Sequence, residues 1–544
     1  MSKAGAADRI FFGGDVITMD EKRPVAEAVA VADGKISAVG SKNDLMALKG
    51  PSTEMVDLRG RTLLPGFLDG HSHFINAVRL ASWANVSSPP AGEVKTFADL
   101  IATLKAYKER LGLKPGEWLM GYGYDVTSMD ETRELTRADL DPHFPDNPVM
   151  LLHVSLHGAV LNTAGFKAAN YDLNTPTPAG GMTARKPNST EAAGLVMEHS
   201  FLPIYMVMPT PTEAQQLDGM KAAQALYASN GYTTCQDAPM EPPTRPLYHK
   251  AADENRLYLD VVGYVSWLEF PQVLESGAER FKAPYKNHFR IGGVKIVGDG
   301  SPQGKTAFWS KPLLTPGPGG EKEWRGEPNV TPEDLNKTVR LAYDKGIQVM
   351  THCNGDATID MMLEAHEKAG APMGGRTVII HSQFMRPAQL DKYATYGFIP
   401  SFFTNHTFFW GDVHVENLGK ERAYFMSPTA SARKRGIRFS NHSDFAVTPL
   451  DPMFILWSSV NRTSRSGQVI GPDERISAHD GLRALTIDAA YQYGEETRKG
   501  SIEPGKIADL TILDKNPTKV DPAAIKDIKV SETVKDGKTV YKRA

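Results

Sequence analysis

Apolar runs of strand length alternate with longer amphipathic stretches over most of the chain. Each run is bounded by polar or turn-forming residues and has the pattern of a buried strand. Eight such runs cover residues 62–73, 231–238, 257–265, 290–300, 347–356, 377–383, 397–406 and 437–445. Helical patterns lie between them, such as 332–346 and 361–370, which both end in glycine as helix C-termini often do. This alternation predicts an α/β fold, a (β/α)8 TIM barrel whose polar site residues lie at the carboxyl ends of the strands.

The two ends of the chain carry a different, purely β-like pattern. Asp33-Gly34 and Asp536-Gly537 each separate two alternating runs, as the tight turn of a β-hairpin does. Neither end has enough strands to bury a sheet face alone. We therefore predict that residues 1–64 and 500–544 pair into one small β-sandwich domain, and that residues 65–499 form the barrel inserted between them.

The segment from about residue 80 to residue 220 is too long for an ordinary barrel connection. Structureless loops beyond about 15 residues are uncommon in compact domains. We predict that this insertion, which follows the first barrel strand, folds into a lid or cap.

The composition excludes several classes of protein. The 544 residues include 61 Lys and Arg against 64 Asp and Glu, and this net charge of −3 offers no basic field to bind nucleic acid. Two cysteines cannot build a disulfide framework and fit a reducing compartment. The sequence has no signal-peptide pattern and no apolar run of about 18 residues. We expect a cytoplasmic protein that acts on a small molecule. It has no nucleic-acid or membrane partner in this interpretation, and it can form a homo-oligomer.

Imidazole and carboxylate side chains gather at the ends of the predicted strands. Residues i and i+2 of a strand point the same way, so His71 and His73 present two imidazoles to one point. A single histidine in an apolar strand is more often a core residue, but several at successive strand ends favour a metal site. Imidazole and carboxylate together suit zinc or a similar divalent ion. The strand-end residues are His71, His73, His352, His381 and Asp444, and Lys295 lies in the fourth strand.

Several motifs occur in a fixed order along nearly the whole chain. They are LLPGFLDGHSHF, VKIVGDGS, THCNGD, IIHSQ, HSDFAVTPLDP and KGSIEPGKIADLTILD. Together they resemble the amidohydrolase superfamily of metal-dependent hydrolases, and most closely its N-substituted formamide deformylase-like branch. The resemblance implies a (β/α)8 barrel that carries one or two metals, beside a small β-domain.

The resemblance also divides the predicted ligands between two divalent ions, with zinc as the expected metal. His71 and His73 hold the more buried ion, and His352 and His381 hold the second. Lys295 matches the lysine that this family carbamylates, and its carbamate bridges both ions. A buried lysine shifts its pKa readily, so it can lose the proton that prevents ligation. The alternative is an ordinary strand lysine, which leaves a single metal.

Asp444 matches the aspartate that touches the first metal and moves protons. A bound metal lowers the pKa of its water to about 7 and polarises a carbonyl oxygen. The hydroxide then attacks the carbonyl carbon, while Asp444 takes the proton and returns it to the departing nitrogen. His406 matches a histidine after the seventh strand that hydrogen-bonds the substrate carbonyl. The alternative for Asp444 is an Asx-turn or helix cap after a strand.

Substrate contacts are expected from two regions. Tyr124 in GYGYD and His157 in HVSLHGAVLN match pocket positions of the family. Phe408 and Trp410 belong to the run FFTNHTFFW, and an apolar or aryl group on the substrate follows if they line the pocket. Such an aromatic cluster is otherwise part of a core. Glu198 matches a family glutamate in the insertion. The alternative is that Glu198 is only a solvated residue on a helix.

His442 departs from the family, because relatives commonly have glycine before the Ser-Asp pair. It shares a strand face with Asp444, where it either tunes the site or packs as a core residue behind the metal ligands.

The sequence therefore predicts a metal-dependent amidohydrolase that cleaves a non-peptide carbon–nitrogen bond, in an amide, N-acyl or N-formyl group. A mononuclear deaminase or esterase on the same scaffold is the alternative among enzymes, because fold and metal do not fix the bond that is cleaved. A catalytically inactive barrel that only binds is the alternative outside enzymes.

Overall fold

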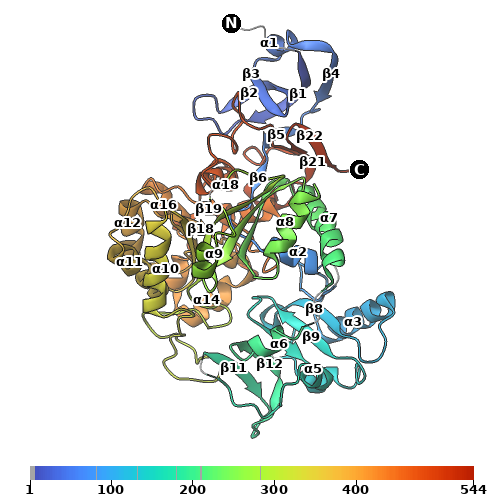
Figure 1. Ribbon diagram of the computed structural model, residues 1–544, viewed down its shortest axis with the longest axis vertical. Coiled ribbons are helices and arrows are strands. Elements are labelled where there is room, and N and C mark those ends of the chain that lie inside the picture. Colours follow the sequence, from blue (N-terminus) through green and yellow to red (C-terminus); the bar gives the residue numbers. More distant parts are fainter. Residues whose placement is uncertain (1–5, 81–82, 132, 179, 209–210, 282) are drawn as a thin grey trace.

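The computed structural model describes residues 6–80, 83–131, 133–178, 180–208, 211–281 and 283–544. Three parts follow one another along its long axis (Figure 1). Strands from both ends of the chain lie at one end, the central α/β sheet with its helices lies in the middle, and the inserted segment lies at the other end. The N- and C-termini therefore lie in the same part of the molecule.

Eight strands form the central sheet, and each predicted run supplies one of them. They are β6 (Phe67–Leu68), β13 (Tyr232–Met240), β14 (Asp260–Ser266), β15 (Phe289–Val297), β16 (Gln348–Cys353), β17 (Val378–His381), β18 (Ile399–Phe402) and β19 (Ser440–Asn441). All neighbouring pairs are parallel and follow the chain order. Just beyond the strands, Asp444 N donates to His71 O over 3.3 Å, which joins the segments after the last and the first strand. The α/β, TIM-barrel-like architecture predicted from the sequence is confirmed.

The first predicted strand, 62–73, is in fact two strands that belong to different sheets. Strand β5 (Thr62–Pro65) pairs with the strands of the chain ends, and β6 pairs with β13 in the central sheet. Gly66 lies between them, and a Cβ atom there would lie only 2.5 Å from Thr233 Cγ2. Glycine therefore allows the chain to pass from one sheet directly into the other.

Helices follow most strands of the central sheet. They are α7 (Glu213–Ser229), α8 (Arg245–Asp253), α9 (Phe270–Ser276), α10 (Pro332–Asp344), α11 (Asp356–Lys368), α12 (Pro387–Tyr396), α13 (His406–Phe409), α14 (Gly411–Leu418), α15 (Lys420–Tyr424), α16 (Thr429–Lys434), α17 (Pro452–Asn461), α18 (Ala478–Leu485) and α19 (Ile487–Gln492), with 3₁₀ turns at Pro472–Glu474 and Pro522–Asp527. Within the described ranges, no helix is both long and apolar enough to cross a membrane.

Helix α10 shows why the sequence forms these elements. Thr331 accepts a hydrogen bond from Asp334 N, and Pro332 occupies the first helical position, so the helix start is capped. Leu335, Val339 and Ala342 are buried on one face, at the spacing of successive helical turns. They pack in one core cluster with apolar side chains of β15 and β16, which fixes the helix against the sheet.

The two chain ends contribute to one sheet in the order β22-β21-β20-β5-β1-β2-β3, with β4 beside β1. Its further strands are β1 (Ala7–Ile17), β2 (Val25–Ala32), β3 (Lys35–Gly40), β4 (Lys49–Asp57), β20 (Leu510–Leu513), β21 (Val530–Lys535) and β22 (Lys538–Lys542), and α1 (Lys42–Met46) follows β3. Both predicted hairpin turns are confirmed, since Asp33-Gly34 and Asp536-Gly537 have φ angles of 50°, 71°, 50° and 77°. A sandwich of two packed layers, and the domain boundaries at residues 64 and 500, stay predictions.

The inserted segment has its own sheet, in the order β11-β12-β10-β9-β8-β7. The strands are β7 (Ala84–Asn85), β8 (Leu119–Tyr124), β9 (Val149–His153), β10 (Gly158–Leu161), β11 (Gly181–Arg185) and β12 (Ala192–Glu198). The helices here are α3 (Phe97–Leu111), α4 (Arg137–Leu140), α5 (Thr163–Ala168) and α6 (Leu202–Tyr205), with a 3₁₀ turn at Val126–Ser128. Helix α2 (Phe74–Leu80) precedes the insertion and packs beside the central sheet (Figure 1), in one core with side chains of α7 and α8. Leu104, Leu119, Val149 and Val160 belong to a separate hydrophobic core of this segment.

A buried ion cluster joins the central sheet to the chain ends. Asp260, at the start of β14, is 4% exposed and lies 2.5 Å from Lys499 Nζ and 3.1 Å from Lys535 Nζ. Lys535 also lies 3.1 Å from Asp509. Burial alone would raise the pKa of Asp260, but Lys499 and Lys535 hold it well below its usual value. Each charge is therefore compensated by a partner from another part of the fold.

We expect Asp260→Asn to destabilise the protein by about 1–3 kcal/mol, because the two buried lysines lose their shared carboxylate but keep Glu495, Asp509 and Asp536 as partners. The measurement is the urea midpoint of unfolding, compared with Glu367→Gln, which breaks the exposed Lys392–Glu367 pair and should cost under about 1 kcal/mol. Because folding lowers the pKa of Asp260, its contribution is present at neutral pH and is lost as the pH falls below about 4. Equal midpoints at pH 7 would contradict the role of the cluster.

Candidate metal centre and its cavity

The predicted metal ligands come from five strands of the central sheet and lie at one edge of it. His71 and His73 follow β6, His352 lies near the end of β16, and His381 is the last residue of β17. Lys295 lies in β15, and Asp444 comes after β19. Carboxyl ends of parallel strands meet at the same rim, so residues far apart in the chain converge there.

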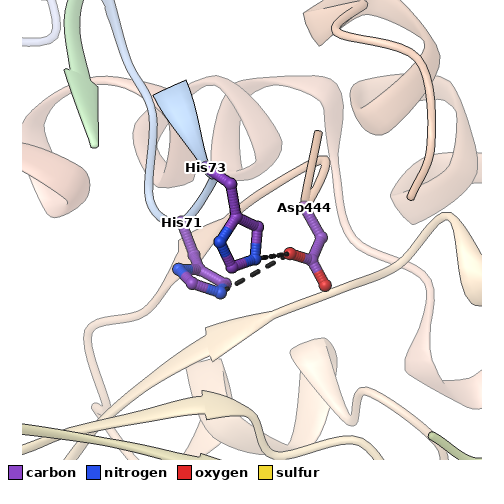
Figure 2. Close-up of side chains that lie close together, drawn as sticks. All are labelled: His71, His73 and Asp444. Atoms are coloured by element: carbon purple, nitrogen blue, oxygen red, sulfur yellow. Dashed lines mark ion pairs between the residues drawn. The ribbon is translucent and has the colours of Figure 1, made fainter. Parts of the chain in front are cut away.

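His71, His73 and Asp444 form the first group of possible ligands (Figure 2). Asp444 Oδ1 lies 3.2 Å from His73 Nε2 and 3.5 Å from His71 Nε2. Lys295 Nζ lies 3.2 Å from His71 Nε2. The amine of Lys295 therefore faces this ligand group.

His381, His442 and Asp444 form the second group. His381 Nδ1 lies 3.1 Å from His442 Nε2, and His381 Nε2 lies 3.8 Å from Asp444 Oδ2. His352 Nδ1 approaches the same histidine, at 3.2 Å from His381 Nε2. The structure therefore brings the four predicted histidines together and adds His442, whose role the sequence left open.

Neighbouring side chains orient these imidazoles. Gln236 donates through Nε2 to Gly70 O and to the Tyr493 hydroxyl, so its Oε1 accepts from His71 Nδ1 at 2.7 Å. The lone pair of His71 is then on Nε2, toward Asp444. His442 Nδ1 lies 2.8 Å from the Ser401 hydroxyl, and this contact holds the ring with Nε2 toward His381. Such partners fix the tautomer of metal-binding histidines.

His352 is oriented from the opposite ring edge. Its Nε2 lies 2.9 Å from Asn354 Nδ2, 3.3 Å from Gly300 O and 3.4 Å from Asp299 Oδ1, and its Nδ1 faces His381. Asp299 is itself fixed, because it accepts hydrogen bonds from Asn354 N and Gly355 N. Asp299 and Asn354 thus hold His352 in place.

Burial sets the charge states at the site. It lowers the pKa of His71, His352 and His381 well below the usual value, so these imidazoles are neutral and offer lone pairs. It also lowers the pKa of Lys295 to about 7, which makes the neutral amine accessible at physiological pH. Burial acts to raise the pKa of Asp444, but His73, 3.2 Å away, and the other histidines hold it well below its usual value.

These residues fit a divalent cation. Asp444 Oδ1 is buried and makes no hydrogen bond to any described residue, although two imidazole nitrogens lie within 3.5 Å of it. An ionised carboxylate and imidazole lone pairs repel one another unless a cation lies between them. Asp444 and His381 also have φ angles of +53° and +67°, a strained backbone that non-glycine residues adopt rarely outside functional sites.

A cavity of about 380 Å³ opens above the first ligand group. His71, His73, Lys295, His352 and Asp444 line its floor. Its walls are mostly apolar, and the lining side chains there include Leu80, Trp83, Leu152, Leu156, Met206, Met208, Pro239 and Val447. Most of these residues belong to the inserted segment and the helices beside it, so the insertion forms the wall of the cavity.

His157 is the predicted substrate contact that lines this cavity. Its Nδ1 lies 3.1 Å from Glu198 Oε2, and its ring lies 6.0 Å from that of His352. Burial lowers the pKa of His157, but Glu198 outweighs burial and raises it. Glu198 is the last residue of β12 and not a solvated helix residue, so the insertion supplies a polar pair next to the metal ligands.

Tyr124, Phe408 and Trp410 do not line the cavity. The Tyr124 hydroxyl is buried against Glu134 Oε2 at 3.0 Å, and Phe408 packs edge-on against Phe454. Trp410 donates through Nε1 to Asp125 Oδ2 over 2.9 Å. Their placement gives no support to a substrate-binding role, because all three are held in cores or at the seam between insertion and sheet.

His406, the predicted second catalytic residue, also lies outside the cavity lining. Its Nδ1 is 3.0 Å from His414 Nε2, and Phe403 packs between its ring and the rings of His381 and His442. A direct contact of His406 with substrate therefore stays a prediction.

Sequence reasoning missed the orienting residues and the apolar wall. Gln236 is one of several buried amides, and nothing in its local sequence marks it as a partner of His71. Met206 and Met208 lie in the run FLPIYMVM, whose apolar character was the available signal.

We expect Gln236→Leu to weaken zinc binding about 10- to 100-fold, because His71 loses the acceptor that fixes its tautomer. The measurement is competition with a chromophoric zinc chelator. Gln236→Glu keeps an acceptor oxygen at the same position and should retain most of the affinity. Equal affinities of Gln236→Leu and the wild type would show that His71 is oriented by other contacts.

Comparison with known proteins finds relatives that are similar over nearly the whole chain. N-substituted formamide deformylase of Arthrobacter pascens is 26% identical to this chain, over 98% of each protein. Putative amidohydrolase YtcJ of Bacillus subtilis is 28% identical, over 98% of this chain and 99% of its own length.

Solved structures share the fold. An uncharacterized metal-dependent hydrolase from Pyrococcus furiosus has a TM-score of 0.73 at 22% identity, over 94% of this chain and all of its own. One from Pyrococcus horikoshii has a TM-score of 0.73 at 23% identity, over 94% of this chain and 99% of its own.

Residues 54–541 match the amidohydrolase family. The chain belongs to the amidohydrolase family, and it is an enzyme, a metal-dependent hydrolase of carbon–nitrogen bonds other than peptide bonds.

Proposed function

We propose that this enzyme hydrolyses an N-formyl or other N-acyl amide of an apolar amine, with Asp444 as the group that carries the proton. The observation that carries the proposal is the position of Asp444, which belongs to both ligand groups at the floor of an apolar cavity. The similarity to a protein named N-substituted formamide deformylase supports formamides as the first substrates to test.

Two divalent ions, with zinc as the first choice, fit the donors present. His71, His73 and Asp444 would hold one ion, and His352, His381, His442 and Asp444 offer donors for the second. Lys295 lies beside the first group with a pKa of about 7, and its neutral amine can react with CO₂ to give a carbamate with two further oxygen donors. Bound ions of this kind supply hydroxide at neutral pH and polarise a carbonyl oxygen.

Asp444 has the properties that proton transfer requires. Its pKa lies well below the usual value, so the carboxylate is ionised at neutral pH and can accept a proton at Oδ1 or Oδ2. Asp444 also lines the cavity, so the same oxygen can return the proton to the amine nitrogen as the carbon–nitrogen bond breaks. His157 lines the same cavity as Asp444 and is held by Glu198, so its imidazole can orient the amide.

The cavity walls indicate which group the substrate carries. Trp83, Leu152, Leu156 and Met208 present apolar surface to a ligand whose amide lies on the floor. A buried apolar group gains about 25 cal/mol for each Å² removed from water, so an alkyl or arylalkyl substituent binds better than a polar one. Exclusion of water by this substituent strengthens the electrostatic interactions at the floor.

We expect Asp444→Asn to keep the fold and to lower kcat by about 10²- to 10⁴-fold, because an amide cannot carry the proton. The measurement is release of the free amine from a series of N-alkyl and N-arylalkyl formamides by zinc-loaded protein. Asp473→Asn, at an exposed position, is the matched control. Wild-type turnover in Asp444→Asn would remove Asp444 from the reaction, and failure of the wild type on amides of every class would overturn the proposed function.

Lys295→Ala should lower the bound zinc from two equivalents to about one, because the carbamate oxygens are lost. The measurement is metal content per chain after loading in bicarbonate buffer, together with a ¹³C signal from labelled bicarbonate that the variant lacks. One equivalent in the wild type, without a ¹³C signal, would contradict the two-metal site and favour a mononuclear deaminase or esterase.

A further inference from the structure

A second cavity, of about 350 Å³, lies where the inserted segment meets the central part of the molecule. Its lining comes from residues 85–91 and 122–128 and Val154 of the insertion, from Leu226 and Asn230 at the C-terminal end of α7, from residues 445–451 directly after Asp444, and from Phe409 and Arg465. Val447 lines this cavity and also the candidate active-site cavity. The second cavity is therefore a neighbour of the active site, but its described lining contains no metal-ligand candidate.

Arg465 is held in place before any ligand binds. Its backbone N–H donates to Phe408 O over 3.2 Å. Ser464 and Ser466, on either side of it, donate hydroxyl hydrogen bonds of 2.8 and 2.7 Å to Asp412. The guanidinium lies over the rings of Phe408 and Phe409, at 5.5 and 5.2 Å from their centroids. These cation–π contacts fix the plane of the guanidinium and occupy none of its hydrogen-bond donors.

The guanidinium of Arg465 is half-buried, and it forms no hydrogen bond or ion pair with any described residue. Its Nε is buried without an acceptor, and Asp125 acts on it only through its charge. Arg462, three residues earlier, shows the usual alternative, because its buried guanidinium donates to the carbonyls of Met426, Ser427 and Ile470. A buried donor without an acceptor costs free energy, so this position favours an acceptor brought by a ligand.

The other charged groups of the cavity limit the charge of that ligand. Asp125 also lines the cavity, but its oxygens accept hydrogen bonds from Thr127 N, Ser128 Oγ and Trp410 Nε1. Asp451 is likewise used, because it caps the start of α17. These two carboxylates would repel a dianion such as a phosphate monoester more strongly than a single carboxylate.

We propose that the second cavity is a carboxylate-binding site in which Arg465 binds the carboxylate through two parallel hydrogen bonds. A guanidinium fork matches carboxylate geometry, and a fixed fork loses little freedom on binding. The carboxylate is either the far end of the substrate or a separate small molecule. The carboxylate site does not depend on the proposed function. Only the first source, a carboxylate carried by the substrate, rests on it.

Binding is tested by calorimetric titration of the metal-loaded protein with sodium hexanoate, and with hexanamide as the neutral probe of equal size. We expect hexanoate to bind at least 10-fold more tightly than hexanamide, and Arg465→Gln to remove this difference. Arg465→Lys keeps the positive charge but lacks the two parallel N–H donors, so it should retain only part of the preference for hexanoate over hexanamide. Arg110→Gln is the matched control, because Arg110 also lies over an aromatic ring, that of Tyr107, but in α3. Thermal unfolding of each variant verifies that it is folded.

The source of the carboxylate is tested by kinetics. If the substrate carries it, an N-acyl amide with a terminal carboxylate should have a kcat/KM about 10- to 100-fold above that of its methyl ester, and Arg465→Gln should abolish the preference. If a separate molecule carries it, hexanoate should change the hydrolysis of a neutral formamide in the wild type but not in Arg465→Gln.

Equal binding of hexanoate and hexanamide by the wild type would overturn the proposal, as would unchanged hexanoate binding in folded Arg465→Gln. A protein that hydrolyses no amide but still binds hexanoate through Arg465 would retain the carboxylate site and refute the proposed function instead.

Discussion

The architecture depends on one electrostatic constraint, the burial of several unprotonated ligand atoms at a single point. Neutral imidazoles from four strands and an ionised aspartate face one another across 3.1 to 3.8 Å. Such a group is held together only if the backbone forces the side chains to converge and a cation compensates their repulsion. The parallel sheet supplies the convergence, because each strand delivers its last residues to the same rim. Contacts from Gln236, Ser401 and Asp299 then hold the imidazole rings in place, and Gln236 leaves the Nε2 lone pair of His71 facing inward.

The inserted segment supplies most of the surface above this rim. The strand ends provide charged and polar groups. The wall formed by the insertion adds apolar surface, and His157, paired with Glu198, adds a polar group to it. The candidate metal ligands and the cavity wall therefore come from different parts of the chain, as in other barrels whose loops carry the variation.

The sequence predicted the sheet well because its strands are fully buried. A parallel strand covered on both faces needs a continuous apolar run, and all eight runs were found for that reason. The histidines at the strand ends followed from the same geometry.

Contacts between side chains distant in the sequence were not predictable in this way. Phe408 and Trp410 have the composition of a binding pocket, but packing against Phe454 and a hydrogen bond to Asp125 place them elsewhere. Likewise, His442 differed from a family pattern, and only the fold placed its Nε2 beside His381.

The passage of the chain through Gly66 has a consequence for biosynthesis. Strand β5 is bound on one side by β20, which includes residues almost 450 positions later, while β6 continues from it into the rim that carries His71. On the ribosome, the first barrel strand therefore emerges long before β20 can pair with β5. The rim around His71 reaches its final form only after the last strands leave the exit tunnel, because in a nascent chain stopped before residue 510 the segment before β6 pairs with β1 but still lacks β20.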